Sequence, residues 1–391
     1  MAEVLTVAHI SDTHLGYRSL SKEDPRTGVN QREVDVYHAF AHAMKAIQEA
    51  SPDLVLITGD LFDKKVPSIW SLRRAFRVLR TVQESRGGKP LILLGGNHDT
   101  PRTRESSAVF PLFEEIPGIK AVYGMPEQVQ LPELNASVMC VPAASAARLA
   151  DENLRPEPDE RFRFNILAVH GVLQGLFTHE YTPFFLPMSR VLDERWDYIA
   201  LGDYHDFRKV SRNAAYAGAT EFTTTNIWSE NPEKGWVWVE IEKGKPPLIR
   251  HRTVSTRKVL SLPDVDASQC ASAEEAIETV LAEAQQDEVT GALVRVRILN
   301  LPYTERARVH RAIVEKMADA FHVQVDFRAA PRTVPSASGQ QTGTGIAQPI
   351  EERWRQFVEE HKEELPAEIG AEEVISRGLQ ALGAVGEVTS P

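Results

Sequence analysis

Short apolar runs recur through the first half of the chain and are rich in Val, Ile and Leu, as buried strands are. They lie at residues 5–10, 54–58, 91–94, 138–141, 166–169 and 198–201. Between the first three runs, residues 36–50 and 69–82 carry apolar positions at helical spacing. Strands that alternate with helices predict an α/β layered domain. Short strands follow closely from about residue 210, so we expect the second half of this sheet system to be antiparallel.

A different unit begins near residue 257. Residues 276–284 and 304–321 have the apolar spacing of helices. Residues 293–299 and 323–327 alternate apolar and polar positions, which is typical of strands with one solvated face. The pattern predicts a small α+β domain of about 70 residues. We therefore place the first domain at residues 1–256 and the small domain at residues 257–330.

The C-terminal region has a different composition. Residues 331–348 are rich in Pro, Ser, Gly, Thr and Gln, which is typical of a flexible linker. Trp354 and Phe357 then lie on one helical face, and a second segment with the same spacing surrounds Val374. Two amphipathic helices cannot form a core alone. Residues 349–391 therefore need a surface on which to dock, either of this protein or of a partner.

Composition narrows the class of protein. The chain has 391 residues, 42% hydrophobic and 25% charged, with a formal net charge of −11. This charge argues against a protein that coats nucleic acid by bulk positive charge, but it allows an enzyme with a local basic rim. The two cysteines lie far apart, which fits a reducing compartment. The N-terminus reads as a strand, and no run reaches the ~18 apolar residues of a spanning helix, so we expect a cytoplasmic protein without membrane contact.

Polar side chains suited to metal binding follow five of the predicted strands. The clusters are Asp12 and His14; Asp60 and Asp63; Asn97, His98 and Asp99; His170; and Asp203 with His205. Each cluster lies at the carboxyl end of its strand, which is the edge where α/β proteins build their sites. A single Asp or His in such a place is usually a cap or turn residue. Five clusters in succession make that explanation a poor one.

The residue types in these clusters favour divalent cations. Carboxylate, imidazole and amide oxygen ligands suit Mn²⁺, Fe²⁺ or Zn²⁺. The clusters hold more ligands than one ion needs, so we expect two ions about 3.5–4 Å apart, which would clamp a phosphoester and activate water. The sequence thus predicts a two-metal phosphoesterase, with Mn²⁺ as the first choice and Fe²⁺, Mg²⁺ or Zn²⁺ as the other candidates.

The motifs Asp-x-His, Gly-Asp-x-x-Asp and Gly-Asn-His-Asp, followed by two later His-bearing motifs, resemble those of the calcineurin-like metallophosphoesterase superfamily. Within it, residues 9–16 and 216–223 resemble the SbcD-type nuclease subunit of DNA double-strand-break repair complexes. The resemblance covers residues 4–255 well and extends weakly beyond them. It implies a four-layer α/β/β/α metallophosphoesterase sandwich, a small α+β capping domain, and C-terminal helices that bind an ATPase partner.

The resemblance also implies roles for the clustered residues. The ligands would be Asp12, His14 and His205 for one ion, Asn97, His170 and Asp203 for the other, and Asp60 between the two. His98 is similar to the family's catalytic histidine, which protonates the leaving oxygen, and Asp63 would orient it by accepting a hydrogen bond. The chain reads Gly-Asp-Tyr-His where the family usually reads Gly-His-x-His. As a ligand, Asp203 would make the site one charge more negative; otherwise it is a turn residue, and Asp206 or water completes the site.

Basic side chains in the loops beside these motifs are candidates for contacts with DNA phosphates. They are Arg18, Lys22, Arg32, Lys64, Lys65, Arg102 and Arg104. We therefore predict a two-metal DNA nuclease that forms a homodimer, binds an SbcC-type ATPase and is nucleoid-associated in the cytoplasm. One alternative is a phosphoesterase for nucleotides, lipids or phosphoproteins. The other is a non-catalytic DNA-end-binding scaffold, against which the presence of His98 and Asp63 argues.

Overall fold

The computed structural model describes residues 4–100, 109–149, 154–175, 185–286, 289–329, 354–355, 358–359, 370 and 372–379. The chain folds as two units, residues 1–330 and residues 331–391. In the second unit residues 372–379 are helical, and the indole of Trp354 donates a hydrogen bond to the Ile375 carbonyl oxygen at 3.3 Å. The predicted linker at 331–348 lies outside the described residues. No helix in the described part of the chain is long and apolar enough to cross a membrane.

The first of two large sheets contains the strands predicted at the start of the chain. Its order is β12 (Leu248–Thr253), β11 (Gly235–Glu242), β1 (Val4–Ile10), β2 (Leu54–Thr58), β3 (Leu91–Leu94) and β4 (Ile119–Val122). Strands β1 to β4 are parallel, whereas β11 and β12 pair antiparallel. The predicted antiparallel character of the later strands is confirmed for these two.

The second sheet is also mixed. Its order is β5 (Glu127–Leu131), β6 (Ala136–Val141), β7 (Phe164–His170), β8 (Tyr198–Gly202), β10 (Ala214–Tyr216) and β9 (Arg208–Ser211). The four central strands are parallel, and the edge strands β5 and β9 are antiparallel to them. Parallel strands bring their carboxyl ends to one edge, so the residues that follow β7 and β8 lie together.

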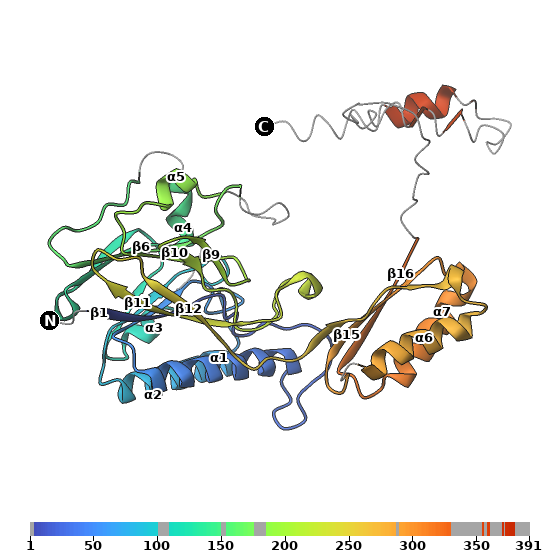
Figure 1. The fold of residues 1–391 in the computed structure, drawn as a ribbon, viewed down its shortest axis with the longest axis horizontal. Helices are drawn as coiled ribbons and strands as arrows, with labels where there is room; N and C mark the ends of the chain where they lie inside the picture. The colour runs from blue at the N-terminus through green and yellow to red at the C-terminus, as the bar shows by residue number, and fades with distance from the viewer. Residues whose placement is uncertain are drawn as a thin grey trace. The chain divides into compact units, whose positions relative to one another are not determined.

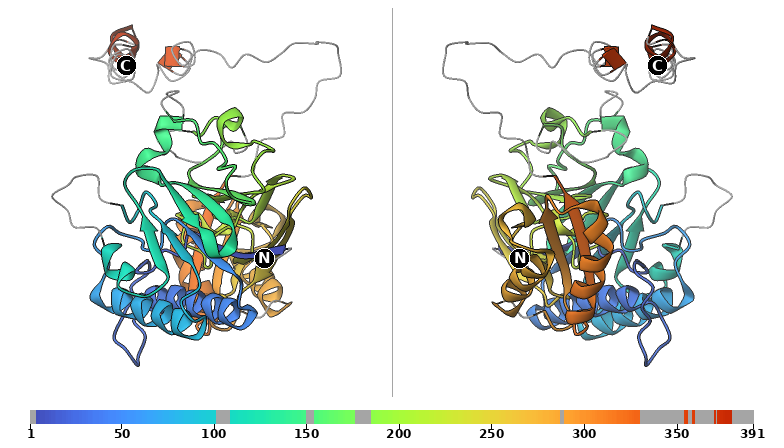
Figure 2. Two further views of the ribbon diagram at one scale, coloured as in Figure 1. Left: turned by 90° about the vertical axis from the view of Figure 1, so that its left-hand side faces the viewer. Right: turned by 90° about the vertical axis from the view of Figure 1, so that its right-hand side faces the viewer.

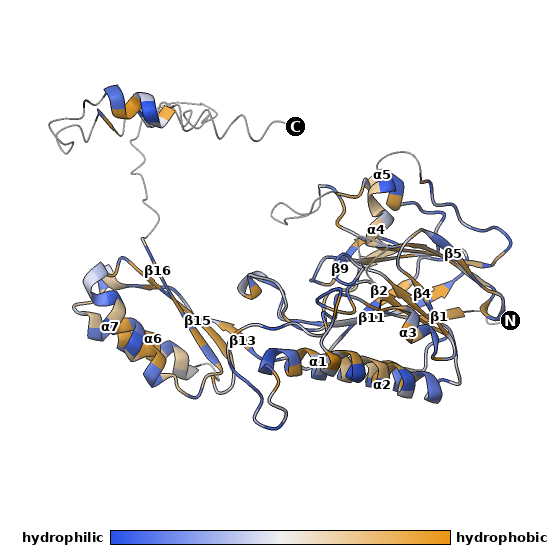
Figure 3. Ribbon diagram, turned by 180° about the vertical axis from the view of Figure 1, so that it is seen from behind, coloured by the Kyte–Doolittle hydropathy of each residue, from blue (hydrophilic) through white to orange (hydrophobic). Residues whose placement is uncertain are grey.

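Helices cover the outer faces of the two sheets, as Figure 1 shows. They are α1 (Gln31–Ala50), α2 (Ile69–Ser85), α3 (Pro111–Glu114), α4 (Ala143–Ala146) and α5 (Met188–Val191), with 3-10 turns at Pro132–Leu134, Ala147–Leu149 and Ile227–Ser229. Phe40 and Leu79 bury α1 and α2 against the first sheet. Leu56 and Ile166 belong to the apolar core between the sheets. Figure 3 shows hydrophobic segments of the strands beside this core in orange. The result is the predicted α/β layered domain.

Polar caps fix the start of each long helix. The side-chain oxygen of Asn30 accepts a hydrogen bond from the Arg32 backbone amide at 3.1 Å, and the Ser68 hydroxyl accepts one from the Ser71 amide at 3.0 Å. Such bonds satisfy amides that have no partner within the helix. Helix α1 begins before the predicted residue 36, because its first turn is capped but polar and therefore lacks an apolar period.

The strands and helices between Val259 and Arg328 form a small α/β unit (Figure 2). It contains β13 (Val259–Ser261), β14 (Val265–Asp266), a 3-10 turn (Ala267–Gln269), α6 (Ala273–Gln286), β15 (Leu293–Leu299), α7 (Tyr303–Lys316) and β16 (His322–Arg328). Strands β13, β14 and β16 all pair parallel with β15. The α+β prediction was therefore wrong for this unit, because alternating polarity does not distinguish a parallel from an antiparallel strand. Helix α7 also ends at Lys316, earlier than the predicted residue 321.

Candidate metal centre

The clustered polar residues meet where the parallel strands of both sheets end. Asp12 and His14 follow β1, Asp60 follows β2, and His170 ends β7. The backbone amide of Asp12 bonds the Gly59 carbonyl oxygen at 3.1 Å, and that of His14 bonds the Asp60 carbonyl oxygen at 2.9 Å. These bonds hold Asp12, His14 and Asp60 at φ values of 50°, 45° and 51°. Non-glycine residues adopt such left-handed conformations mainly where the surroundings enforce them, often at functional sites.

Glycines allow the strands to approach closely at this edge. A Cβ atom on Gly59 would lie 2.0 Å from His170 Nδ1, and one on Gly96 would lie 2.0 Å from Asp60 Oδ1. A Cβ on Gly202 would lie 2.0 Å from the Thr58 carbonyl oxygen. The glycines beside the motifs therefore create space that the side chains of the centre occupy.

Half of the centre surrounds His14. Its Nε2 atom lies 3.2 Å from Nε2 of His205 and 3.7 Å from Oδ2 of Asp60. Its Nδ1 atom lies 3.5 Å from Oδ1 of Asp63. Ligand atoms of Asp12, His14 and His205 all lie within 4.8 Å of one another. Two imidazole nitrogens this close need either a proton or a cation between them.

The other half surrounds His170. Its Nδ1 donates to the Thr58 carbonyl oxygen at 2.8 Å, so its Nε2 carries a lone pair in the neutral ring. That Nε2 lies 2.9 Å from Asn97 Oδ1 and 3.6 Å from both Asp60 Oδ2 and Asp203 Oδ1. The backbone amide of Asp203 donates to both carboxylate oxygens of Asp12, at 3.1 and 3.2 Å. This bond joins the two halves.

Burial and mutual charge shift the pKa values at this edge. Burial raises the pKa of Asp12 to about 6, opposed by the charge of His170 and assisted by that of Asp60. Burial would also raise that of Asp60, but the charge and hydrogen bond of His170 outweigh it and lower the pKa. For His14, burial acts downward, and the carboxylates of Asp63, Asp60 and Asp12 prevail and raise the pKa to about 8. The buried carboxylates thus share protons with histidines.

The residues at this edge fit divalent cations. Asp12, Asp60 and His170 form a second group whose ligand atoms lie within 4.8 Å of one another. The groups offer carboxylate oxygen, imidazole nitrogen and one amide oxygen, a mixed set that Mn²⁺, Fe²⁺ and Zn²⁺ accept. A bound cation would displace the shared protons and satisfy the buried carboxylates. Asp60 lies within 3.7 Å of the ligand nitrogens in both halves, which is the position of a shared ligand.

His98 and Asp63 lie beside this centre. The His98 backbone amide donates to Asp60 Oδ1 at 2.9 Å, and its ring meets His14 edge-on with centroids 4.8 Å apart. The bond expected from His98 to Asp63 is present at 3.0 Å, but Nδ1 donates to the Asp63 backbone carbonyl oxygen. The Asp63 carboxylate faces His14 instead. The buried Asp99 carboxylate accepts from the Gly96 and Phe62 amides and so shapes the loop.

Four of the predicted loop cations lie in loops that leave the metal edge. Arg18 and Lys64 line a shallow hollow of about 220 Å³ with Leu15, the residue after His14. The Arg18 side chain is half exposed and pairs with Glu33 at 2.6 Å. Lys65 is partly buried. The Lys22 ammonium donates to the Phe321 carbonyl oxygen of the small unit.

Arg32 was wrongly predicted as a DNA contact. Its side chain is 1% exposed and pairs with Asp35 at 2.9 Å and Glu221 at 3.2 Å. It also donates to the Phe222 carbonyl oxygen at 2.7 Å, so its guanidinium is used inside the fold. Arg102 and Arg104 lie outside the described residues.

Sequence reasoning missed two side chains that contact His205. The Thr223 hydroxyl lies 3.3 Å from His205 Nδ1, and the Lys234 ammonium donates to the His205 carbonyl oxygen at 3.0 Å. Thr223 lies in segment 216–223, whose resemblance to SbcD-type chains was its one signal. No signal in the sequence marked Lys234, because a lone lysine before a strand is usually a surface residue.

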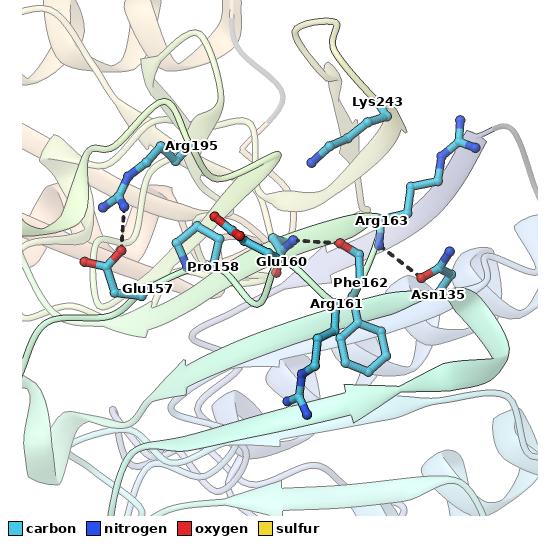
Figure 4. Close-up of a pocket in the computed structure, with 10 residues that line it drawn as sticks. Asn135, Glu157, Pro158, Glu160, Arg161, Phe162, Arg163, Arg195 and Lys243 are labelled. Atoms are coloured by element: carbon cyan, nitrogen blue, oxygen red, sulfur yellow. Dashed lines mark hydrogen bonds and ion pairs between the residues drawn. The ribbon is translucent and has the colours of Figure 1, made fainter.

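A hollow of about 650 Å³ lies at the opposite ends of the strands, and Figure 4 shows residues that line it. Arg163 and Phe162 precede β7 there, and Lys243 follows β11. Arg195 pairs with Glu157 at 2.5 Å, and Lys243 pairs with Asp197 at 2.9 Å. These two ion pairs lie away from the strand ends that carry the candidate ligands.

Comparison with known proteins identifies the family of the chain. Residues 5–237, more than half of it, match the family described as calcineurin-like phosphoesterase. The chain is 31% identical over 272 residues to the DNA double-strand break repair protein Mre11 of Thermoplasma acidophilum, covering 64% of this chain and 65% of that protein. It is 28% identical over 280 residues to that of Saccharolobus solfataricus, covering 66% of each. The chain thus spans slightly less than two thirds of these relatives. Together with the buried Asp and His side chains that could hold metal ions, these matches show that the chain belongs to the calcineurin-like phosphoesterase family as a metal-dependent enzyme related to Mre11.

Proposed function

We propose that this chain is the DNA nuclease subunit of an SbcCD-like double-strand-break repair complex and hydrolyses phosphodiester bonds. The observation that carries the proposal is the convergence of ligands from both sheets beside exposed basic loops. The similarity to DNA double-strand break repair proteins supports the choice of DNA as substrate. Two divalent ions, with Mn²⁺ as the first choice, would complete the centre.

The distances support a division of ligands between the two ions. Asp12, His14 and His205 would hold one ion, because their ligand atoms form one compact group. Asn97, His170 and Asp203 would hold the other, since His170 Nε2 faces both oxygens. Asp60 would be shared, because Oδ2 faces both His14 and His170.

The protein groups around the ions supply orientation and a proton. When bound, the ions would activate water and neutralise charge on the phosphoester. His98 is exposed at the rim of the centre. Its Nδ1 is held by the Asp63 carbonyl oxygen, which fixes the ring and leaves Nε2 for a substrate oxygen. His98 would thus protonate the leaving oxygen as a general acid.

Phosphate contacts beside the centre would position DNA without reading its sequence. Arg18 and Lys64 are the best placed, because both line the hollow that begins one residue after His14. Lys65 follows in the same loop. Lys22 is a weaker candidate, since its ammonium already bonds the small unit.

The remaining regions would organise the complex. Residues 257–330 would act as a capping domain over the nuclease domain, and residues 331–348 as a linker. Residues 349–391 would dock on an SbcC-type ATPase, and two copies of the chain would form a homodimer in the cytoplasm, associated with the nucleoid. Truncation after Pro331 should spare hydrolysis of a small chromogenic diester and abolish co-purification with such an ATPase. Unchanged co-purification would reject the docking role.

DNA cleavage tests the proposal. End-labelled linear DNA is incubated with the purified chain in Mn²⁺ and in chelator, beside a His98→Ala variant. His38→Ala is the matched control, because His38 is an exposed histidine on α1. We expect Mn²⁺-dependent cleavage by the wild type and the control but not by His98→Ala. Hydrolysis of a chromogenic diester without cleavage of DNA, alone or with the ATPase, would move the substrate to a small molecule.

A further inference from the structure

A buried lysine lies behind one of the proposed metal ligands. Lys234 is 1% exposed, although lysines are almost never fully buried unless paired. Its ammonium donates to the His205 carbonyl oxygen and to Asp206 Oδ1, both at 3.0 Å, and pairs with Glu230 at 2.5 Å. The ring of Phe222 lies 5.1 Å below it. The ammonium group of Lys234 is therefore bound by a carbonyl oxygen and two carboxylates of the protein itself.

The position of Lys234 connects the two sheets at the metal edge. Lys234 directly precedes β11 of the first sheet, whose next residues pair with the end of β1. His205 follows β8 of the second sheet. The bond from Lys234 to His205 thus fixes the ligand loop of one sheet to a strand of the other, beside the strand that leads to Asp12.

The ion pair of Lys234 with Glu230 also positions the residue that contacts Nδ1 of the His205 ring. Glu230, which pairs with Lys234, also accepts hydrogen bonds from the Thr224 amide at 3.2 Å and the Thr224 hydroxyl at 2.5 Å. This places the preceding residue, Thr223, with its hydroxyl 3.3 Å from His205 Nδ1. A hydrogen bond at Nδ1 sets which tautomer presents Nε2 to a metal.

We infer that Lys234 and Thr223 are positioning residues for metal binding by His205. Lys234 fixes the backbone of His205, and Thr223 fixes the orientation of its ring. The inference rests on the proposed assignment of His205 as a ligand. Partners that orient a metal ligand typically contribute 10–100-fold to metal affinity. Loss of Lys234 should therefore weaken the ion held by His205 and spare the ion held by His170.

Mn²⁺ titration of the metal-free chain, followed by the electron paramagnetic resonance signal of free Mn²⁺, tests this inference. In Lys234→Met we expect one of the two dissociation constants to rise 10- to 100-fold and the other to stay within about threefold. Lys243→Met is the matched control, because Lys243 lies at the other end of β11, is 46% exposed and pairs with Asp197. Unchanged affinities in Lys234→Met would overturn the inference.

A double variant separates positioning from general stability. Lys234→Met leaves Asp206 and Glu230 without a cation, so the melting temperature in chelator should fall; adding Glu230→Gln removes one repelling charge and should restore part of it. The Mn²⁺ affinity should remain low, because the donor to His205 is still missing. Affinity that recovers together with the melting temperature would show a structural role only and contradict the inference.

Two further results distinguish a failure of this inference from a failure to fold and from a failure of the nuclease proposal. If Lys234→Met does not fold, Thr223→Val removes only the hydroxyl beside His205 and should weaken the same ion about tenfold; unchanged affinity there would overturn the inference. A wild type that binds two Mn²⁺ ions but cleaves no DNA, with the selective loss in Lys234→Met, would contradict the nuclease proposal and support this one.

Discussion

Two clusters of buried charge in this protein differ in what neutralises them. At the junction with the small unit, Arg257 forms two bonds with the Asp35 carboxylate, at 2.6 and 2.7 Å, and Arg32 pairs with Asp35 and Glu221. At the metal edge, the side chains that can give Asp12 and Asp60 a positive partner, among the described residues, are histidines, which are cations only while they hold a proton. The first cluster is complete as folded, and the second is complete only with protons or metal ions.

The pKa values of one carboxylate from each cluster, Asp35 and Asp12, show the same contrast. At the junction, burial acts to raise the pKa of Asp35, but the hydrogen bond and charge of Arg257 outweigh it and lower the pKa. At the metal edge, burial raises that of Asp12 to about 6, and no arginine or lysine in the described part of the chain opposes it. The guanidinium thus keeps Asp35 charged inside the fold, whereas the surroundings of Asp12 suit a site that binds a cation.

Loss of the shared carboxylate should have the largest effect. Asp60→Ala removes the one side chain that faces both halves of the centre, so neither ion should remain bound and hydrolysis of any phosphodiester should fall to background. Turnover of a chromogenic diester at saturating Mn²⁺ measures this. Wild-type turnover in the variant would show that Asp60 is not a shared metal ligand.

His98→Ala should separate metal binding from chemistry. The side chain touches the centre through a ring contact with His14 and contributes no ligand atom in the proposed arrangement. Mn²⁺ affinity should stay near the wild-type value, while turnover falls ~10²–10⁴-fold, which is the usual contribution of a general acid or base. Full activity in this variant would show that another group donates the proton.

Arg32→Met should produce the opposite pattern at the junction. It leaves Asp35 and Glu221 buried with less positive charge, and breaking such a buried pair typically costs ~3–5 kcal/mol of unfolding free energy. Urea unfolding of the metal-free chain measures the loss, and Mn²⁺ stoichiometry should not change. An unaltered unfolding midpoint would mean that the junction does not stabilise the fold.

Metal affinity should depend on pH because Mn²⁺ competes with the proton of His14. The pKa of His14 is raised to about 8, so its folded state holds a proton below that pH and releases it above. The apparent dissociation constant for Mn²⁺ should increase about tenfold for each pH unit below 8, for each proton displaced. Titrations at pH 6.5, 7.5 and 8.5 test this, and a constant affinity would contradict proton sharing at the edge.

Asp203→His should have the smallest effect, since it replaces one ligand type with another. The variant restores the residue usual in the family and removes one negative charge, so Mn²⁺ binding should weaken by less than about tenfold, or ~1.4 kcal/mol. Calorimetric titration distinguishes this from the complete loss expected of Asp60→Ala. Tighter binding in the variant would contradict the expected contribution of the Asp203 charge.

Much of the candidate site could be predicted because each polar cluster immediately follows an apolar strand. The predicted run at 54–58 is β2 itself, and that at 91–94 is β3. Strand polarity then places Asp12, Asp60 and His170 at one edge. These inferences need only neighbours in sequence and the rule that parallel strands end together.

The features that the sequence did not predict depend on partners far along the chain. Arg32 reads as a loop cation, yet its partner Glu221 is 189 residues away and closes around it only in the fold. Lys234 likewise meets His205 across the two sheets. The accepting atom at Asp63 is a backbone oxygen, which every residue has. Local pattern carries no information about any of these contacts.

The most direct test of the account is the number of Mn²⁺ ions bound per chain. Native mass spectrometry of the Mn²⁺-loaded wild type, beside Asp60→Ala and Arg32→Met, counts them at one pH. The account predicts two ions in the wild type, two in Arg32→Met and none in Asp60→Ala. One ion or none in the wild type, or two in Asp60→Ala, would contradict a two-metal centre built around Asp60.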